Sequence, residues 1–458
     1  MGTETREVVV VGGGTAGAFA AAAAASKGRD VVVLERKPAS EAGQIACGDA
    51  LKRAGGFPDV VDTDRLRQEA VTNRSLRRAV FLNPDGQDYE YRFRDRGAVV
   101  DRARFGEVLL DEAARAGADI HYNTVVTDVC QNGRVRGVDA VRDGDPVTYE
   151  SAVVVDAAGS LSLLQERVDF AGTRYDTTAQ YSQFCSAYRE IIETPDPVEY
   201  DDALVFKPTE ELGYLWYFPR SPTVVNAGLG FQMSERPLEL VDVLERDLQT
   251  RPEFEGARVR DSLGAALPTR RPYDSAVAPG FLSAGDAAGH VNPTNGEGLS
   301  GAARAGYFAG NVAADAVAEG TVDEAGLWGY NRAVQATFGG GYAALDLYNI
   351  LATAHGMDEI TEFVAGLPGQ QLLDIVTERG RFAPTPIELF TLGIRTLVGT
   401  RGHWDLLYEG YRVRELADQL ETVYEDYPTD PEGFEAWRDR RDAVLAEVYE
   451  VTGADPKY

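Results

Sequence analysis

Short apolar runs, each followed by glycines or by a change to helical spacing, organise the first third of the chain. Residues 7–11 form one such run, and an Ala-rich stretch leads from the glycines to a second run over residues 31–34. This order predicts a strand, a helix and a second strand, which is a βαβ unit. A helix over residues 100–115 is also expected, because apolar side chains recur at helical spacing at Phe105, Val108, Leu109 and Ala113.

The middle of the chain changes to the pattern of strands. Apolar runs predict strands within residues 120–129, 135–141 and 153–155. From about residue 170 to 265, aromatic and alternating segments separated by prolines predict an antiparallel sheet. A short buried strand over residues 281–284 and an Ala/Gly-rich helix over 298–318 follow, and the pattern beyond about residue 340 is helical.

The segment GYLWYFPR carries bulky apolar groups on both faces. In a strand, Tyr214, Trp216 and Phe218 share one face, and Leu215 and Tyr217 share the other. Such a strand has no solvent face. It is therefore either a buried core strand or the aromatic wall of a binding site, and the alternation alone leaves both interpretations open.

Composition narrows the class of protein. The 458 residues are enough for two or three packed domains, and 44% hydrophobic and 26% charged residues are typical of a soluble globular protein. The net charge is −28, and lysine occurs only at Lys27, Lys37, Lys52, Lys207 and Lys457. An acid-rich, Lys-poor surface indicates a protein kept soluble in high salt, or an ordinary acidic cytosolic protein. It argues against nucleic-acid binding, which needs a basic surface.

The three cysteines are Cys47, Cys130 and Cys185, widely spaced and without a CxxC pair. This spacing argues against a disulfide framework or a structural metal site, and it favours a reducing cytoplasm. The Ala-rich run over residues 19–25 follows a predicted strand and is too short to span a bilayer. We therefore expect a cytoplasmic protein.

The glycines after the first strand fit the GxGxxG fingerprint of dinucleotide binding. Gly12 allows the tight turn, Gly14 lets a pyrophosphate approach the backbone, and Gly17 allows close packing of helix and strand. The free N–H groups of the helix N-terminus favour the phosphates. Glu35 ends the second strand, where it can accept from ribose hydroxyls. Further positions expected at the cofactor are Ala16, Arg36 and Val126.

Two later segments indicate FAD rather than NAD. VVVDAAGS ends an apolar strand with Asp156 and Gly159, and it would return the chain beside the first phosphate loop. SAGDAAGHVNPTNGEGLSGAARAG places Asp286 after a strand, where it can accept from a ribitol hydroxyl. The N–H groups of Gly298 and Leu299 can face the pyrimidine edge of an isoalloxazine, where the helix dipole stabilises an anionic reduced flavin.

These three segments, in this order, resemble the FAD enzymes of the para-hydroxybenzoate hydroxylase fold. VVDRARF resembles the arginine-bearing segment of that superfamily, which implies that Arg102 lies near the pyrophosphate. KPASEAGQIACGDAL, GYLWYFPR and GDAAGHVNPTNGEGLSGA resemble the geranylgeranyl reductase family, from residue 5 to about 320. The YxWxFP pattern of that family is matched by Tyr214, Trp216, Phe218 and Pro219. Ala50 and Arg220 depart from it, because the family often has glycine and lysine there.

The resemblance implies a mixed α/β (α+β) fold. Its parts are a Rossmann-like FAD-binding domain, an antiparallel-sheet substrate domain and a C-terminal helical region. We expect the first part of the FAD-binding domain in residues 1–165 and the substrate sheet in 166–270. The second part of the FAD-binding domain is expected in residues 271–340, and the helical region in 341–458.

The implied activity is the FAD-dependent reduction of isolated carbon–carbon double bonds in geranylgeranyl chains, by hydride transfer from flavin N5. In archaea, these are the chains of ether-linked membrane lipids. Tyr214 and Trp216 would then line a prenyl channel beside the flavin, with Phe218 and Pro219 as further substrate contacts. The alternative, a core strand with no ligand, stays open.

Cys47 and Gly48 are expected beside the flavin, and Cys47 is either a proton relay or an inert small side chain. His290 is either an acid or a hydrogen-bonding group near the flavin. The candidate catalytic residues are therefore Cys47, Tyr214, Trp216 and His290.

The implied partners are a prenylated lipid and an external electron donor, which is ferredoxin, a reduced deazaflavin or NADPH. The tail segment PIELFTLGIRTLVG, residues 386–399, predicts a membrane-facing helix or an ordinary packed one. Peripheral contact with the inner membrane face is expected of an enzyme whose substrate is a lipid. The alternatives are a flavin monooxygenase of the same fold and a flavoprotein without turnover. Together with the acidic composition, the resemblance suggests a haloarchaeal source.

Overall fold

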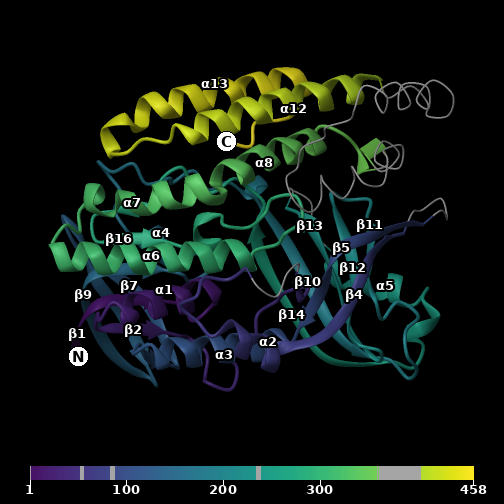
Figure 1. Ribbon diagram of the computed structural model, residues 1–458, viewed down its shortest axis with the longest axis horizontal. Helices are drawn as coiled ribbons and strands as arrows, with labels where there is room; N and C mark the ends of the chain where they lie inside the picture. The colour runs from purple at the N-terminus through teal and green to yellow at the C-terminus, as the bar shows by residue number, and fades with distance from the viewer. Residues whose placement is uncertain (1, 52–55, 83–87, 234–238, 358, 361–403) are drawn as a thin grey trace.

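The computed structural model describes residues 2–51, 56–82, 88–233, 239–357, 359–360 and 404–458. Within these residues the chain forms two eight-stranded sheets and a layer of helices (Figure 1). The first sheet has the order β15-β16-β9-β1-β2-β6, and β8 and β7 continue from β9. Its strands are β1 (Gly2–Val11), β2 (Val31–Leu34), β6 (Asp119–His121), β7 (Thr124–Asn132), β8 (Arg134–Arg142), β9 (Asp145–Asp156), β15 (Val277–Ala278) and β16 (Phe281–Ser283).

The predicted βαβ unit forms the centre of the first sheet. β1 pairs in parallel with β2 on one side and β9 on the other, and the valines of β1 are buried where these pairs meet. Helix α1 (Thr15–Ser26) is buried along almost its whole length. Its alanines let α6 (Leu299–Glu319) approach so closely that a Cβ at Gly306 would lie 2.1 Å from the Ala16 carbonyl oxygen. The Ala-rich run is therefore the contact surface of a tight helix pair.

The second sheet has the order β14-β10-β13-β12-β11-β4-β5-β3. Five of its strands lie where the antiparallel sheet was expected: β10 (Phe184–Glu193), β11 (Ala203–Pro208), β12 (Gly213–Ser221), β13 (Val224–Gln232) and β14 (Arg258–Pro268). The other three, not foreseen, come from earlier in the chain: β3 (Ala50–Leu51), β4 (Val71–Phe81) and β5 (Tyr89–Val100). The expected boundary at residue 165 therefore does not separate the two sheets.

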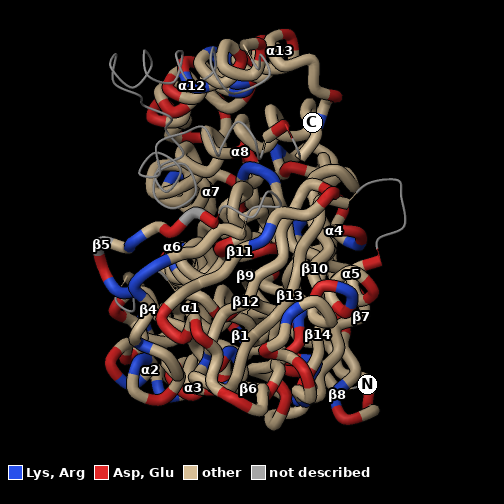
Figure 2. Tube along the Cα trace, turned by 90° about the vertical axis from the view of Figure 1, so that its right-hand side faces the viewer, with Lys and Arg blue, Asp and Glu red and all other residues tan. Residues whose placement is uncertain are grey.

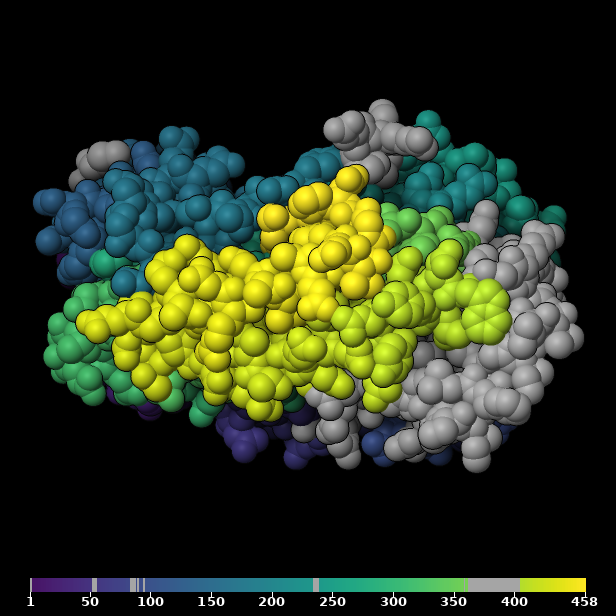
Figure 3. Space-filling view, turned by 90° about the horizontal axis from the view of Figure 1, so that it is seen from above, coloured from purple at the N-terminus to yellow at the C-terminus, as the bar shows by residue number. Residues whose placement is uncertain are grey.

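Helices connect and cover the sheets. Near the first sheet lie α2 (Thr63–Ala70), α3 (Arg102–Arg115), α4 (Leu163–Arg167) and α7 (Glu324–Val334), and α5 (Leu240–Leu248) packs on the second sheet. The helical C-terminal region comprises α8 (Gly340–Thr353), α12 (Trp404–Glu425) and α13 (Phe434–Thr452). Figure 3 shows α12 and α13, in yellow, lying side by side across the top of the molecule.

The tail segment 386–399 lies outside the described residues. No helix in the described ranges is both long and apolar enough to cross a bilayer. Acidic and basic positions are interspersed along the trace (Figure 2), and many form exposed ion pairs, such as Lys27 with Asp315 at 2.7 Å.

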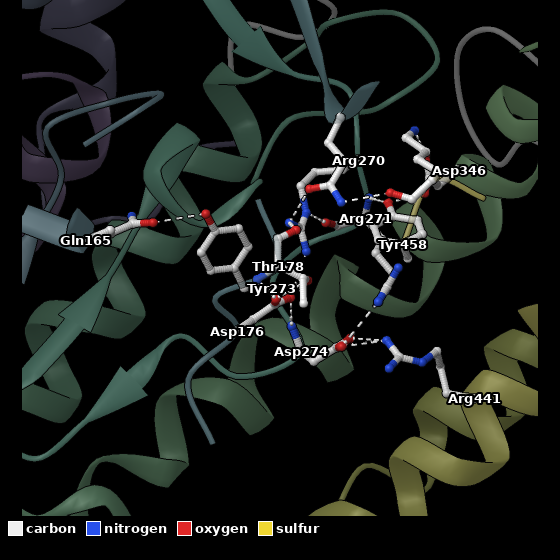
Figure 4. Close-up of polar contacts among 12 residues, drawn as sticks. Gln165, Asp176, Thr178, Arg270, Arg271, Tyr273, Asp274, Asp346, Arg441 and Tyr458 are labelled. Atoms are coloured by element: carbon white, nitrogen blue, oxygen red, sulfur yellow. Dashed lines mark hydrogen bonds and ion pairs between the residues drawn. The ribbon is translucent and has the colours of Figure 1, made fainter. Parts of the chain in front are cut away.

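A buried charged network joins the helical region to the rest of the protein (Figure 4). Asp274, between β14 and β15, accepts from Arg271 at 3.2 Å and from Arg441 of α13 at 2.6 Å. Nearby, Arg270 donates to Asp176 at 2.7 Å. Burial alone would raise the pKa of Asp274, but the two guanidinium groups hold this pKa well below its usual range.

Removing the carboxylate of Asp274 is expected to destabilise this junction strongly. Asp274→Ala leaves the guanidinium groups of Arg271 and Arg441 buried without their shared acceptor, which costs about 3–5 kcal/mol of unfolding free energy. Thermal unfolding followed by circular dichroism should show a clearly lower melting temperature. Lys27→Ala is the control, since breaking its exposed pair costs about 1 kcal/mol or less. Equal melting temperatures for the two variants would contradict this role of Asp274.

Candidate functional site

The phosphate loop of the fingerprint lies between β1 and α1. Gly12 has φ +100°, a conformation that favours glycine, and a Cβ there would lie 2.4 Å from the Ala157 carbonyl oxygen. A Cβ at Gly17 would lie 1.9 Å from the carbonyl oxygen of Gly12. Gly14 precedes α1 without a side-chain cap, and a Cβ there would meet only Ile45 Cδ1, at 3.9 Å. The loop is therefore tight where the chain folds back and open at the helix N-terminus, as phosphate binding requires.

Glu35 lies directly beside this loop. Its carboxylate accepts from the backbone N–H groups of Gly13 at 2.8 Å and Lys37 at 2.9 Å, and the side chain is buried. These bonds fix the carboxylate at the end of β2, where an adenosine ribose is held in dinucleotide-binding proteins. Arg36, by contrast, is exposed.

Arg102 supplies a buried positive charge next to the same helix N-terminus. Its Nη2 donates to Thr15 Oγ1 at 2.8 Å, whereas its Nη1 is buried without a hydrogen-bond partner. Burial lowers the pKa of Arg102, so this cation needs a negative partner. An unpaired buried guanidinium N–H beside an open helix N-terminus fits an anionic pyrophosphate.

The second and third cofactor segments meet the first as the sequence predicts. Asp156 of β9 pairs with Val11, so the following loop lies beside Gly12. The Asp156 carboxylate accepts from Ser162 at 2.8 Å and Gln165 at 3.0 Å, and these bonds hold the loop itself. Gly159, at φ +87°, leaves open space where a Cβ would stand.

Asp286 and the start of α6 form the remaining part of the cofactor site. A Cβ at Gly298 would lie 3.6 Å from Asp286 Oδ1, and burial raises the pKa of Asp286 to about 6. Helix α6 begins at Leu299; Glu297 accepts from the Ser300 N–H at 2.9 Å, so the N–H groups of Gly298 and Leu299 are the ones that can meet a ligand acceptor. Of the other predicted positions, Ala16 packs against Gly285, and Val126 lies half-buried in β7.

The two-faced strand is β12, and its faces have different surroundings. Leu215 and Tyr217 pack in a core cluster with Leu244 of α5, as expected. On the opposite face, the ring of Trp216 lies over Gly228, where a Cβ would come within 2.4 Å of Trp216 Cζ2. Phe218 lies next to it, with ring centroids 6.2 Å apart.

Two further hydrogen bonds, from the Tyr214 hydroxyl and to the Pro219 carbonyl oxygen, fix β12 to neighbouring elements. Tyr214 donates its hydroxyl to the Asn295 carbonyl oxygen at 2.8 Å, in the loop that leads to α6. The carbonyl oxygen of Pro219 accepts from Asn73 Nδ2 at 2.8 Å. The aromatic face of β12 is therefore held both to the third cofactor segment and to β4.

The Cys47–Asp49 loop lies directly on this aromatic face. Trp216 Nε1 donates to Asn226 Oδ1 at 2.9 Å, and Asn226 Nδ2 donates to the Cys47 carbonyl oxygen at 2.8 Å and to Asp49 Oδ2 at 2.6 Å. Arg220 donates to the same Asp49 oxygen at 2.8 Å. A Cβ at Gly48 would lie 3.0 Å from the Phe218 ring, so the loop and the ring are in close contact. We call these bonds among Cys47, Asp49, Trp216, Arg220 and Asn226 the loop-to-strand network.

Asp49 and Asn226 were not among the residues that the sequence singled out. Asp49 is fully buried, has φ +68° and keeps its Oδ1 without a hydrogen-bond partner. Burial raises its pKa, against the effect of Arg220. The sequence signal was available for Asp49, which directly follows the Cys-Gly pair. Asn226 had no such signal, because its role depends on its cross-strand position opposite Phe218.

Burial decides the protonation state of the two candidate proton donors. It raises the pKa of Cys47 to about 11, so this side chain is a neutral thiol at neutral pH. It lowers the pKa of His290 to about 3, so the imidazole is neutral as well. His290 Nδ1 accepts from the Gly285 N–H at 3.1 Å, and its ring packs against Tyr330 and Phe338. This geometry favours the hydrogen-bonding alternative for His290.

The neutral state of His290 gives a measurable pH dependence. The unfolded state, with a pKa near 6.5, binds a proton before the folded state does, so the free energy of unfolding falls as pH drops below about 6.5. His290→Asn keeps an acceptor for the Gly285 N–H but cannot titrate. Urea unfolding at pH 6 and 5 should show the wild type losing about 1.4 kcal/mol more than this variant. Parallel losses would mean that His290 is not buried in its neutral form.

In the described parts of the chain, no three His, Cys, Asp or Glu side chains could together hold a metal ion. A family model for FAD dependent oxidoreductases matches residues 7–206. The digeranylgeranylglycerophospholipid reductase of Sulfolobus acidocaldarius is 26% identical over 434 residues, which cover 92% of this chain and 93% of that protein. Digeranylgeranylglycerophospholipid reductase 2 of Methanothermobacter thermautotrophicus is 30% identical over 366 residues, which cover 76% and 88%.

Solved structures show the same fold. A geranylgeranyl bacteriochlorophyll reductase-like protein of Thermoplasma acidophilum has a TM-score of 0.69 at 21% identity, over 90% of this chain and 100% of that one. A myxobacterial FAD-dependent halogenase has a TM-score of 0.61 at 17% identity, over 90% and 97%. The expected fold class and the FAD cofactor are therefore confirmed. By its sequence relatives and by a site whose residues fit FAD, the chain belongs to the digeranylgeranylglycerophospholipid reductase family of FAD-dependent oxidoreductases.

Proposed function

We propose that this protein saturates isolated carbon–carbon double bonds in the geranylgeranyl chains of a glycerophospholipid. One observation carries the proposal: the aromatic face of β12 packs directly on the Cys47–Asp49 loop, which follows the strand that ends in Glu35. In this proposal, the contact puts an apolar wall and the half-buried thiol of Cys47 at the edge of the FAD site. The names of the relatives support the same substrate class.

Reduction of an isolated alkene needs a hydride at one carbon and a proton at the other. When bound, reduced FAD supplies the hydride from N5. Cys47 is the proposed proton donor, because its raised pKa keeps the proton on sulfur until an acceptor forms. Trp216 and Phe218 keep water out and offer ring faces to positive charge that develops on the chain.

The two electrons come from an external donor, for which ferredoxin, a reduced deazaflavin and NADPH are the candidates. Because the substrate is a lipid, transient peripheral contact with a membrane is part of the proposal. The acidic composition supports work in concentrated salt, so the assays below use high potassium chloride.

Trp216→Phe tests the aromatic wall. The variant loses the indole N–H and leaves Asn226 Oδ1 buried without its donor, so the Cys47 loop loses its register on the strand. We expect kcat/KM for a geranylgeranyl glycerophospholipid to fall about tenfold to a hundredfold, with bound flavin unchanged. The measurement is product mass spectrometry under anaerobic conditions with dithionite as reductant.

Trp404→Phe is the matched control, since Trp404 lies exposed on α12. Equal activity of the two tryptophan variants would overturn the role of Trp216. Absence of any saturated product from the wild type under these anaerobic conditions would overturn the proposed function, and oxygen-dependent hydroxylation would replace it.

Cys47→Ser tests the proton donor. A serine hydroxyl gives up its proton much less readily than a thiol, so kcat should fall about a hundredfold or more while KM changes little. Cys130→Ser is the control, because burial also raises the pKa of Cys130 to about 11 but this thiol lies in β7 of the first sheet. Unchanged kcat in Cys47→Ser would assign the proton to another group.

A further inference from the structure

The aromatic face of β12 continues into a group of arginines. Along β12, Arg220 follows Trp216 and Phe218 at alternate positions, so it leaves the strand close to the same face. Across β13, Gly228 lies opposite both Trp216 and Arg189 of β10. The face that carries the indole therefore also carries guanidinium groups on β12 and β10, the two strands that flank β13.

These arginines line a cleft of about 620 Å³. Arg189, Arg220 and Arg260 contribute its positive groups, and Ile45 and Ile191 contribute apolar surface. Ile45 belongs to the same segment as Cys47, so the cleft lies at one side of the loop-to-strand network. Along β12, Phe218 and then Trp216 lie on this face beyond Arg220.

Acidic groups share the cleft without using all of its donors. Arg189 donates to Asp261 at 2.6 Å, yet the side chain is only 3% exposed and its Nε is buried without a partner. Arg260 binds Glu193 at two points, through Nε at 3.0 Å and Nη2 at 2.7 Å, which leaves Nη1 on a side chain that is 47% exposed. A guanidinium group has five N–H donors, so donors remain for a ligand after these pairs have formed.

The other two charged residues that line the cleft, Arg220 and Asp101, also have partners. Arg220 binds Asp49 Oδ2 through both Nε at 2.8 Å and Nη2 at 2.7 Å, and its Nη1 lies 3.7 Å from Asp101. Asp101 is itself occupied, because its carboxylate caps α3 by accepting from the N–H groups of Ala103 and Arg104. Three arginines in a recess of a chain of net charge −28 are suited to an anion with several oxygen acceptors, which arginine binds better than lysine does.

We propose that this cleft, at the side of the loop-to-strand network, binds the phosphoryl head group of the lipid substrate. This inference rests on the proposed function and adds the means by which the substrate is oriented. The phosphoryl group can belong to a glycerophospholipid or to a prenyl diphosphate, and both carry it at the end of the chain that enters the cleft. The FAD pyrophosphate is held elsewhere, beside Arg102 and Gly14.

Equilibrium binding to the oxidised holoenzyme tests this without turnover. The probes are digeranylgeranylglyceryl phosphate, geranylgeranyl diphosphate, the neutral digeranylgeranylglycerol and NADPH, measured by calorimetry in high potassium chloride. The wild type should bind at least one of the two phosphorylated lipids about tenfold or more tightly than the neutral diether. Whichever of the two phosphorylated lipids binds more tightly identifies the source of the phosphoryl group. Equal affinity for charged and neutral lipids, or binding of neither, would overturn the inference.

Two variants with opposite expected effects on the affinity for the phosphorylated lipid make the test specific. Arg260→Gln, at a partly exposed site, should lower the affinity for the phosphorylated lipid about tenfold. The affinity for the neutral lipid and the FAD content should not change. Asp261→Asn removes the acid that neutralises Arg189 and should raise the affinity for the phosphorylated lipid about threefold to tenfold. Arg246→Gln, on exposed α5, is the control and should change nothing.

Other outcomes of these measurements contradict the inference. Equal weakening of charged and neutral lipids by Arg260→Gln would mean a structural role, and loss of FAD would assign the cleft to the cofactor. A lower affinity for NADPH alone would assign the cleft to the electron donor. Failure of the proposed function is seen separately, as absence of saturated product in the turnover assay.

Discussion

The attachment of the Cys47–Asp49 loop to the second sheet is the constraint on which the site depends. The loop follows the nucleotide-binding half of the first sheet, yet its hydrogen bonds go to Asn226 and Arg220 on β13 and β12. Asp49 adopts a left-handed backbone conformation and is buried, which is sterically and electrostatically costly, and these two donors offset the cost. Without them, the Cys47–Asp49 loop would lose its hydrogen bonds to the strands that carry the aromatic face.

Buried arginines form ion pairs of a different kind from those on the acidic surface. Exposed ion pairs weaken as salt screens them, whereas pairs inside the protein are screened much less. The contacts of Asp274 with Arg271 and Arg441 are of the second kind, and they hold α13 on the segment between β14 and β15. A chain with few lysines thus places its cations where a planar group with several donors is most useful.

The sequence predicted what depends on local pattern. The phosphate loop, Glu35 and the strand that brings Asp156 beside Gly12 lie where spacing put them, because each is set by a few consecutive residues. The two faces of β12 also followed from alternation. Asn226 and the pairing of Arg220 with Asp49 could not be read in this way, because these partners are separated by about 170 residues or more along the chain. The strands β4 and β5 were missed for a related reason, since their many charged residues hide the alternation of a sheet that is partly solvated, and β3 is only two residues long.

The parallel pairing of β4 with β11 links Arg78 and Phe81 to Ala203 and Phe206, more than a hundred residues away. The second sheet therefore cannot close until the chain has been made through β11, and its contacts are non-local ones that form slowly. It also means that the two halves of the enzyme are not separable modules. A fragment limited to residues 166–270 would present the edge of β11 without its neighbour, and an uncovered edge strand is prone to pair with other chains. Recombination between relatives should therefore succeed only where the crossover keeps β4 and β11 from the same parent.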